Sequence, residues 1–351
     1  MKTIVQKMDR NNLKPEEFAL AASLLKEGQL VAFPTETVYG LGGDALDEMA
    51  AKRIYAAKGR PSDNPLIVHI ADASDIEKLA VDIPKTAYAL AGRFWPGPLT
   101  MILKKSDIVP YSTTGGLDTV AIRMPSDEIA RELIRTSGLY IAAPSANSSG
   151  RPSTTKAEHV KEDLDGKIAM ILDGGAVTIG LESTIVDLTG EVPMILRPGY
   201  ITKEMLEEAI GTTEYDKAVV NKEKNVTIVA KAPGMKYKHY APKGDLTIFE
   251  GEMSAVIAGI SKAAKEKEES GAKVGILATE ETKDKYTAGI VKSIGSRKDE
   301  LSIASHLFDT LREFDTLGVS YIYSESFEEG TLGQAIMNRL LKAAGYQRVL
   351  V

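Results

Sequence analysis

The sequence contains no cysteine, which excludes disulfide bonds and thiolate zinc sites. Histidine is scarce as well. The four histidines are spread along the chain, too far apart in sequence to suggest a metal cluster. We therefore expect no metal ligand from a protein side chain, and any metal ion should arrive together with a substrate.

Long apolar runs are also missing. No stretch approaches the length of a transmembrane helix, and the first ten residues, MKTIVQKMDR, lack the apolar centre of a signal peptide. A cytoplasmic location is therefore expected. Positive charge is not in excess, because the formal net charge is −6. This balance argues against a surface built mainly to grip nucleic acid, although it leaves room for a local basic patch.

Several motifs of nucleotide-binding proteins and hydrolases are absent. The chain has no G-x-x-x-x-G-K-[ST] phosphate loop, no G-x-S-x-G and no H-E-x-x-H. Gly40, Gly42 and Ala45 match the loose dinucleotide pattern G-x-G-x-x-A, but Pro34 and the residues after it separate the preceding strand from the first glycine. A dinucleotide site at this place is therefore disfavoured.

The composition is that of a globular protein: of 351 residues, 43% are hydrophobic and 26% are charged. This length suggests two domains. In residues 1–210, predicted strands and helices alternate and the last strands are closely spaced, which predicts a twisted mixed sheet covered by helices. Residues 211–242 are expected to form a linker and a lid, and residues 243–351 a smaller, Rossmann-like α/β domain with a parallel sheet. The expected strands lie at residues 30–33, 66–70, 99–103, 119–124, 139–143, 170–172, 183–188 and 194–196, then at 246–249, 274–277 and 319–323.

The richest chemistry lies in residues 31–70, VAFPTETVYGLGGDALDEMAAKRIYAAKGRPSDNPLIVHI. Asp47 is a helix N-cap candidate and Gly59 stands at the matching C-cap position, so Lys58 and Arg60 leave one helix end together. The next strand carries His69. The alternative for Lys58 and Arg60 is a solvated helix end favoured by the helix dipole.

A second polar stretch, PSANSSGRPS at residues 144–153, directly follows a predicted strand. Its hydroxyls could contact phosphate oxygens, and its alternative is an ordinary turn, since the same residue types dominate turns. Arg123, Ser183 and Arg197 stand at strand ends, where open α/β sheets bind ligands. Together with Lys58, Arg60 and Arg151, these arginines could hold a triphosphate and a carboxylate.

At these residues the sequence resembles the threonylcarbamoyl-AMP synthases in their long, two-domain form. The motifs PTETVYGLGGDA, NPLIVHI, WPGPLT, AIRMPS, ESTIVDL and LRPG occur in that family's order, with the K-x-R of Lys58 to Arg60 and the S-x-N of Ser145 to Asn147. APGMKYKHYAP and the closing ESFEEGTLGQAIMNRLLKAA extend the likeness to the whole chain. The resemblance implies a YrdC-like first domain.

The resemblance also implies an activity. L-Threonine, bicarbonate and ATP, with magnesium bound to the ATP, would give L-threonylcarbamoyl-AMP and pyrophosphate. Other threonylcarbamoylation proteins would use this product to modify tRNA next to the anticodon, and weak binding of tRNA by this chain is possible on the same grounds.

Carried over from the family's motifs, the residues fall into three groups. Lys58, Arg60, Ser145 and Asn147 would be catalytic. L-Threonine would be bound by Thr37, His69, Arg123, Ala143 and Ser183. ATP would be bound by Arg60, Asn64, Thr119, Ser145, Ser153, Arg197 and Tyr237.

Two other classes of function remain open. A binding module for double-stranded RNA would show salt-dependent RNA binding, and a regulatory nucleotide sensor would bind ATP without releasing pyrophosphate. Residues 232–242, with Tyr237 at the centre, are expected to cover the site as a lid, because aromatic residues and lysines alternate there between two prolines. The alternative is that these aromatics dock the two domains together.

Overall fold

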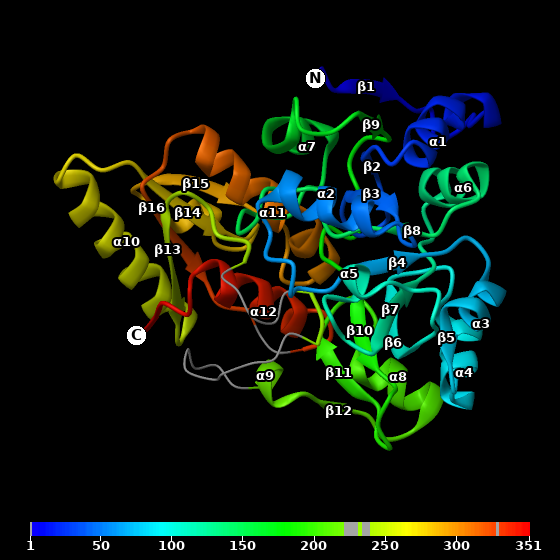
Figure 1. Ribbon diagram of the computed structural model, residues 1–351. Helices are drawn as coiled ribbons and strands as arrows, with labels where there is room; N and C mark the ends of the chain where they lie inside the picture. Colours follow the sequence, from blue (N-terminus) through cyan, green and yellow to red (C-terminus); the bar gives the residue numbers. More distant parts are fainter. Residues whose placement is uncertain (1, 221–230, 234–238, 328–329) are drawn as a thin grey trace.

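The computed structural model describes residues 2–220, 231–233, 239–327 and 330–351. These residues form two sheets, each covered by helices, and Figure 1 shows the two resulting lobes side by side. The first lobe contains the blue, cyan and green part of the chain. The yellow, orange and red part forms the second lobe.

The first sheet contains twelve strands among the described residues, in the order β1-β9-β2-β3-β8-β4-β7-β6-β10-β11-β12, with β5 paired to β6. Parallel and antiparallel pairs are mixed, and β10 runs antiparallel to β11 and parallel to β6, which confirms the predicted mixed sheet. The strands are β1 (Ile4–Lys7), β2 (Val31–Phe33), β3 (Gly40–Asp44), β4 (Ile67–His69), β5 (Ala80–Val81), β6 (Leu99–Lys105), β7 (Thr119–Arg123), β8 (Ile141–Ala142), β9 (Met170–Asp173), β10 (Thr184–Asp187), β11 (Met194–Arg197) and β12 (Glu214–Tyr215).

Helices cover both faces of this sheet. On one face, α1 and α6 pack against each other over a core that includes Phe18, Phe33 and Leu133. On the other face, α4 and α8 pack together over a larger core that contains Trp95, whose indole Nε1 donates to Leu99 O at 2.7 Å. The helices are η1 (Pro15–Phe18), α1 (Ala19–Lys26), α2 (Glu48–Lys58), η2 (Ala73–Asp75), α3 (Ile76–Leu79), α4 (Lys85–Phe94), α5 (Tyr111–Thr114), α6 (Glu128–Ser137), α7 (Ala157–Leu164), α8 (Lys203–Ile210) and α9 (Lys217–Val220).

The second sheet is entirely parallel, in the order β15-β14-β16-β13-β17, which confirms the expected parallel α/β domain. Parallel strands need crossover connections, and the long helices α10 and α11 provide two of them. The elements are β13 (Asp245–Glu250), α10 (Met253–Glu269), β14 (Val274–Ala278), η3 (Lys283–Lys285), β15 (Ile290–Ser293), α11 (Glu300–Thr316), β16 (Tyr321–Glu325), α12 (Gly333–Ala343) and β17 (Arg348–Leu350).

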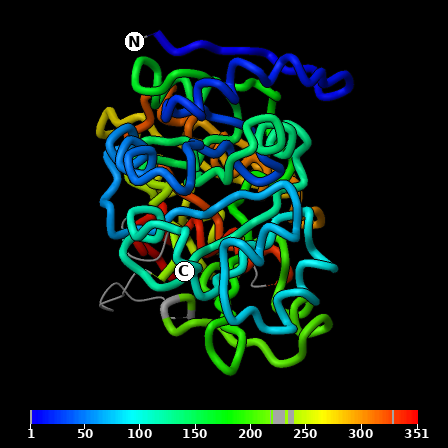
Figure 2. Tube along the Cα trace, turned by 45° about the vertical axis from the view of Figure 1, so that its right-hand side comes forward, coloured from blue at the N-terminus to red at the C-terminus, as the bar shows by residue number. Residues whose placement is uncertain are grey.

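The two domains share one apolar cluster. Val38 and Leu181 of the first domain lie in the same buried cluster as residues of α11 and α12. Tyr240 joins it and stacks on Phe308 of α11, with the ring centroids 5.1 Å apart. Figures 1 and 2 both place the orange and red segments of α11 and α12 against the first domain. The second domain is thus packed onto the first through a buried apolar contact.

The structure differs from the sequence-based expectation at several strands. Residues 40–44, which match the dinucleotide pattern, form the buried strand β3, antiparallel to β2. A Cβ at Gly42 would lie 2.8 Å from side-chain atoms of Phe33 and Ile141, so close packing requires glycine here. Because glycine has no side chain, the alternation of side chains that predicts a strand is missing from this segment. The edge strands β1, β12, β15 and β17, like the two-residue β5, were not predicted. The expected strand at 319–323 begins two residues later, at Tyr321.

None of the helices in the described part of the chain combines the length and the apolarity that a membrane span requires. The stretch 211–231, predicted as a linker from its polarity, begins with ordered elements. In it, Glu214 and Tyr215 add a parallel edge strand to β11. Because an edge strand this short buries little apolar surface, its sequence carries no strand pattern.

Candidate functional site

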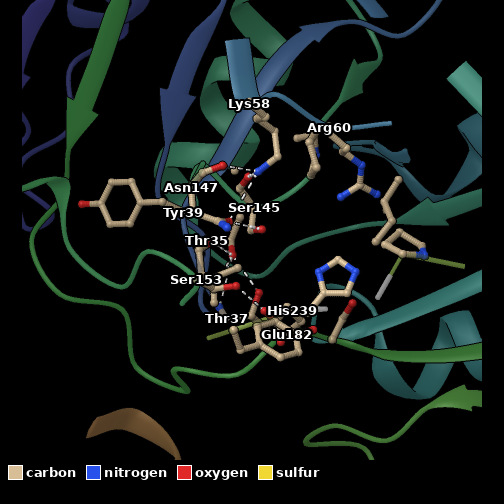
Figure 3. Close-up of a pocket in the computed structure, with 18 of the residues that line it drawn as sticks. Thr35, Thr37, Tyr39, Lys58, Arg60, Ser145, Asn147, Ser153, Glu182 and His239 are labelled. Carbon is tan, nitrogen blue, oxygen red and sulfur yellow. Dashed lines mark hydrogen bonds between the residues drawn. The ribbon is translucent and has the colours of Figure 1, made fainter. Parts of the chain in front are cut away.

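One pocket in the first domain collects most of the predicted site residues. The pocket lies at the ends of strands β4, β7 and β11 and at the starts of strands β3 and β10. Residues of the segment that leads into the second domain also line it. Figure 3 shows the labelled side chains around this space, with Tyr39 turned away from the others. The predicted residues that line it are Thr37, Lys58, Arg60, His69, Arg123, Ala143, Ser145, Asn147, Ser153, Ser183 and Arg197.

Helix α2 delivers the two cations of the K-x-R pair. The Asp47 carboxylate accepts hydrogen bonds from two amides in the first turn, and Gly59 ends the helix in the left-handed conformation with φ +61°, as predicted. Lys58 therefore occupies the last turn and Arg60 follows the reversal of the chain. Arg60 Nη2 donates to Pro65 O at 3.1 Å, which directs its guanidinium along the pocket rather than into solvent.

Lys58 is buried, which rules out the solvated helix end for this residue. Its ammonium group donates to the carbonyl oxygens of Ser145 and Asn147, and Asn147 Oδ1 lies 3.4 Å away. Burial, and after it the neighbouring Arg60, lower the pKa of Lys58 well below its ordinary value. Figure 3 shows these contacts as dashed lines. Lys58 thus ties the end of α2 to the loop after β8.

That loop, residues 144–153, is stiffened by its own polar groups. Ser145 Oγ donates to Asn147 Oδ1 at 2.5 Å, and Asn147 Nδ2 donates to Ser148 O at 2.8 Å and Arg151 O at 3.0 Å. An ordinary turn would leave these side chains in solvent. Here the network fixes Ser145 and Asn147 at the pocket wall, because each polar atom is held by a named partner.

Hydroxyls and one ion pair form the floor of the pocket. The hydroxyl oxygens of Thr35 and Thr37 lie 2.9 Å apart, and Arg123 Nη1 donates to Thr37 Oγ1 at 2.9 Å. Arg123 also pairs with the buried carboxylate of Glu36, 2.8 Å away. Glu36 was not predicted as a site residue, although it stands inside the PTETVYG motif. One guanidinium and two hydroxyls thus face the same space, where they can form hydrogen bonds with a ligand carboxylate although Glu36 balances the charge of Arg123.

Ser183, which directly precedes β10, meets Arg197 at the end of the neighbouring strand β11. Arg197 Nε donates to Ser183 O at 2.9 Å and its Nη2 to Ser183 Oγ at 3.1 Å, while Thr100 Oγ1 lies 2.7 Å from the same hydroxyl. Arg197 is almost completely buried, and this burial lowers its pKa to about 10. Arg197 remains a cation at neutral pH and is held in a fixed direction.

Glu182, His239 and Tyr240 also line the pocket; Glu182 was not predicted, whereas His239 and Tyr240 belong to the segment 232–242 that was expected to cover the site. Glu182 accepts hydrogen bonds from Ser153 and from Arg339 of α12. Burial would raise the pKa of Glu182, but Arg339, Arg197 and Ser153 hold it below its ordinary value. The signal that could have identified it is the acidic residue that opens the motif ESTIVDL, directly before the predicted Ser183.

His239 lies beside Arg60 in Figure 3 and is partly buried. Burial, Arg60 and Lys342 lower its pKa to about 3, so its imidazole is neutral at physiological pH. Its Nε2 atom is buried and has no hydrogen-bond partner within the described part of the chain. An unsatisfied buried ring nitrogen at a pocket wall is a contact point for a ligand.

The remaining predicted residues lie elsewhere. Asn64 and Thr119 are not among the described residues that line the pocket, and Thr119 stands at the end of β7 opposite Arg123. Tyr237 lies outside the described residues. Arg151, counted among the anion-binding cations, is directed to the acids Asp163 and Asp315. Arg151 is also not among the described residues that line the pocket, so its part in anion binding stays a prediction.

His69 carries a prediction about acid stability. It is buried, its Nδ1 lies 3.1 Å from the carbonyl oxygen of Ile67, and burial and Arg123 lower its pKa from 6.5 to about 3. Below about pH 6.5 the unfolded chain binds a proton that the folded protein excludes until about pH 3. The free energy of unfolding should therefore fall with pH in this window, by at most about 1.4 kcal/mol per pH unit from this residue.

In urea titrations at pH 7 and pH 5, His69→Gln should lose less stability on acidification than the wild-type protein. His306→Gln, which changes an exposed histidine, is the control and should keep the wild-type loss. An equal loss in His69→Gln and wild type would show that His69 is not the group responsible.

The pocket thus combines three kinds of group. Arg123 can bind a carboxylate, Thr35, Thr37 and Ser183 provide hydroxyls, and Arg60 and Arg197 are cations that can bind phosphate oxygens. Within the described ranges, no three His, Asp or Glu side chains come together as a metal centre. Among the described residues of the lining, Lys58 donates to loop carbonyls and Ser153 donates to Glu182, which is already paired with Arg339, so neither is arranged as a covalent nucleophile. Its chemistry is therefore that of bringing two anionic reactants together.

Two family models together match most of the chain. Residues 23–199 match the Sua5, YciO and YrdC family model, described as "Telomere recombination", and residues 201–345 match the model "Threonylcarbamoyl-AMP synthase, C-terminal domain". The threonylcarbamoyl-AMP synthase of Bacillus subtilis is 51% identical over 339 residues, 96% of this chain and 95% of that protein. That of Pyrococcus abyssi is 50% identical over 342 residues, 97% of this chain and 98% of that protein.

A solved structure of one of these relatives has the same fold as this chain. The crystal structure of Pyrococcus abyssi Sua5 complexed with L-threonine superposes with a TM-score of 0.93 at 49% identity, and the match covers 99% of this chain and all of that one (100%). A threonylcarbamoyl-AMP synthase of Pseudomonas putida is 36% identical over 51% of this chain and 95% of its own length. The first domain thus has relatives that consist of little else.

Proposed function

The chain belongs to a family of enzymes, the threonylcarbamoyl-AMP synthases in their two-domain form. We therefore propose that it makes L-threonylcarbamoyl-AMP and pyrophosphate from L-threonine, bicarbonate and ATP. The observation that supports this most is the single pocket in which Arg123 and Thr37 face the same space as Arg60 and Arg197. We also propose that tRNA threonylcarbamoylation proteins use the product.

Threonine would occupy the floor of the pocket. The Arg123 guanidinium suits its carboxylate, and the hydroxyls of Thr37 and Ser183 suit its side-chain oxygen. In the relative from Pyrococcus abyssi a structure with L-threonine exists, which supports the same ligand here. His69, neutral and buried, can exchange hydrogen bonds with threonine without adding charge.

ATP would lie across the cations at the other side. N-carboxylated threonine must attack the α-phosphate, so two anions have to approach while charge grows on the leaving pyrophosphate. Arg60 and Arg197 can compensate that charge, and Lys58 holds the loop of Ser145 and Asn147 against the pocket wall. Of the carboxylates, Glu182 and Glu36 are already paired with arginines, so a magnesium ion would be held mainly by the ATP itself.

The lid expected at residues 232–242 remains a prediction. Residues 234–238, with Tyr237, lie outside the described residues, but Pro233 and His239 on either side of them line the pocket. For Tyr240 the docking alternative holds, because its ring stacks on Phe308 of α11. Protection of this segment from limited proteolysis only when ATP and threonine are both present would support a lid, and protection that ignores the ligands would contradict it.

One assay tests the proposed function directly. Pyrophosphate release should require ATP, magnesium, L-threonine and bicarbonate together, and omission of any one of them should abolish it. Release that ignores threonine would contradict the proposal, and ATP binding without any release would indicate a nucleotide sensor instead.

Serine in place of threonine probes the pocket floor. Serine lacks one methyl group, and a missing methyl in a shaped pocket costs about 1–3 kcal/mol, or about 10- to 200-fold in kcat/KM. We expect a loss in that range when pyrophosphate release is measured with each amino acid. Equal values would show that the pocket does not sense the methyl group.

A further inference from the structure

Arg339 of α12 is a fully buried guanidinium from the second domain that reaches the wall of the pocket. Its Nε donates to Glu182 Oε2 at 2.8 Å and its Nη2 to Glu182 O at 3.3 Å. Arg339 Cζ also lies 5.8 Å from the centre of the Tyr240 ring. The second domain is therefore in contact with a residue that lines the nucleotide side of the site.

Glu182 has a second set of partners in the first domain. Ser153 Oγ donates to Glu182 Oε1, and the charge of Arg197 acts on the same carboxylate. Ser153 and Arg197 are two of the residues proposed to contact ATP. Glu182 thus lies between a cation of the second domain and a cation of the first.

The ion pair between Arg339 and Glu182 determines whether Arg197 remains available to bind a ligand. An unpaired buried carboxylate is costly, and in the low dielectric of the interior it acts strongly on the nearest cation. Without Arg339, that cation is Arg197, which already donates to both the carbonyl and the hydroxyl oxygen of Ser183, the residue that follows Glu182. A carboxylate paired with Arg197 would neutralise it and would also repel phosphate.

We propose that Arg339 is a positioning residue of the ATP site: by neutralising Glu182 it leaves Arg197 free to bind the phosphates of the nucleotide. This role rests on the proposed function. It gives the second domain a part in the chemistry of the first, through one ion pair rather than through a contact with the substrate.

The test removes the two charges separately and together. Isothermal titration calorimetry measures the Kd for ATP with magnesium and without threonine. Arg339→Gln should raise that Kd at least about 10-fold, equivalent to about 1.4 kcal/mol. The double variant Arg339→Gln, Glu182→Gln should restore most of the affinity, because the neutral amide no longer competes for Arg197 and still accepts from Ser153. Arg339→Lys, which keeps the charge, should bind ATP more tightly than Arg339→Gln.

Asp309→Asn is the matched control for a loss of domain docking. Asp309 of α11 pairs across the same interface with Lys156 at 2.8 Å and His159 at 3.1 Å, and it does not line the pocket. This variant should lower the melting temperature without raising the Kd for ATP. A purely structural role of Arg339 predicts that Arg339→Gln behaves in the same way.

The outcomes separate this role from the proposed function. Wild-type affinity in Arg339→Gln, or a folded double variant as weak as the single one, would overturn the role while the function stands. Wild-type protein that binds no ATP at all would overturn the function and the role with it. Should Arg339→Gln alone fail to fold, the double variant decides: wild-type affinity is expected, and loss of ATP binding would overturn the proposal.

Discussion

Replacement of Arg60 by alanine is expected to reduce pyrophosphate release about 100- to 1,000-fold while the melting temperature stays close to that of the wild-type protein. Arg60 lines the pocket and contacts neighbouring carbonyl oxygens of Asn64 and Pro65. Its charge is therefore directed in advance at the place where we propose that charge develops on the leaving pyrophosphate. Loss of one such preorganised group typically costs about this much in turnover.

Lys52→Ala provides the control for Arg60→Ala. Lys52 is an exposed cation on the same helix, α2, and an exposed charge contributes at most about 1 kcal/mol. Its removal should leave turnover and melting temperature unchanged. Near-normal pyrophosphate release in Arg60→Ala would assign Arg60 to the helix end alone, as in the alternative drawn from the sequence.

The sequence predicted the parts of the site that depend on local rules. Asp47 and Gly59 define both ends of α2, so the position of Lys58 and Arg60 could be derived from capping alone. The direction of the Lys58 side chain could not be predicted, since it depends on carbonyl oxygens of Ser145 and Asn147, almost ninety residues later in the chain (87 and 89 positions). A helix cap is a local property, whereas the partner of a buried cation is set by the tertiary fold.

Strand β3 shows the opposite limit. Strand prediction relies on alternating side chains, and GLGGD has glycines where close packing against Phe33 leaves no space for a side chain. The Glu182 and Arg339 pair was missed for a further reason. The two residues are 157 positions apart, on different domains, and neither stands in a pattern that indicates charge pairing. Contacts between domains leave no periodic signal in one sequence.

Lys58→Met should lose both turnover and stability, in contrast to Arg60→Ala. The ammonium group of Lys58 is the donor for two carbonyl oxygens of the loop that carries Ser145 and Asn147. Methionine fills a similar volume but donates nothing, and a buried acceptor left without a donor costs about 1–3 kcal/mol. We expect the free energy of unfolding to fall by about 2–4 kcal/mol and pyrophosphate release to fall at least about 100-fold.

Urea titration and the pyrophosphate assay on the same preparation separate the two possible tasks of Lys58. Lys104→Met is the control: Lys104 is exposed and paired with Asp82 at 3.0 Å, so its loss should cost well under about 1 kcal/mol. If Lys58→Met were as stable as the wild type yet inactive, the ammonium group would serve the phosphates and not the loop. If it lost stability but kept its turnover, the loop would hold Ser145 and Asn147 without Lys58. Loss of both is expected, because the ammonium group already donates to the loop and fixes the two side chains that face ATP.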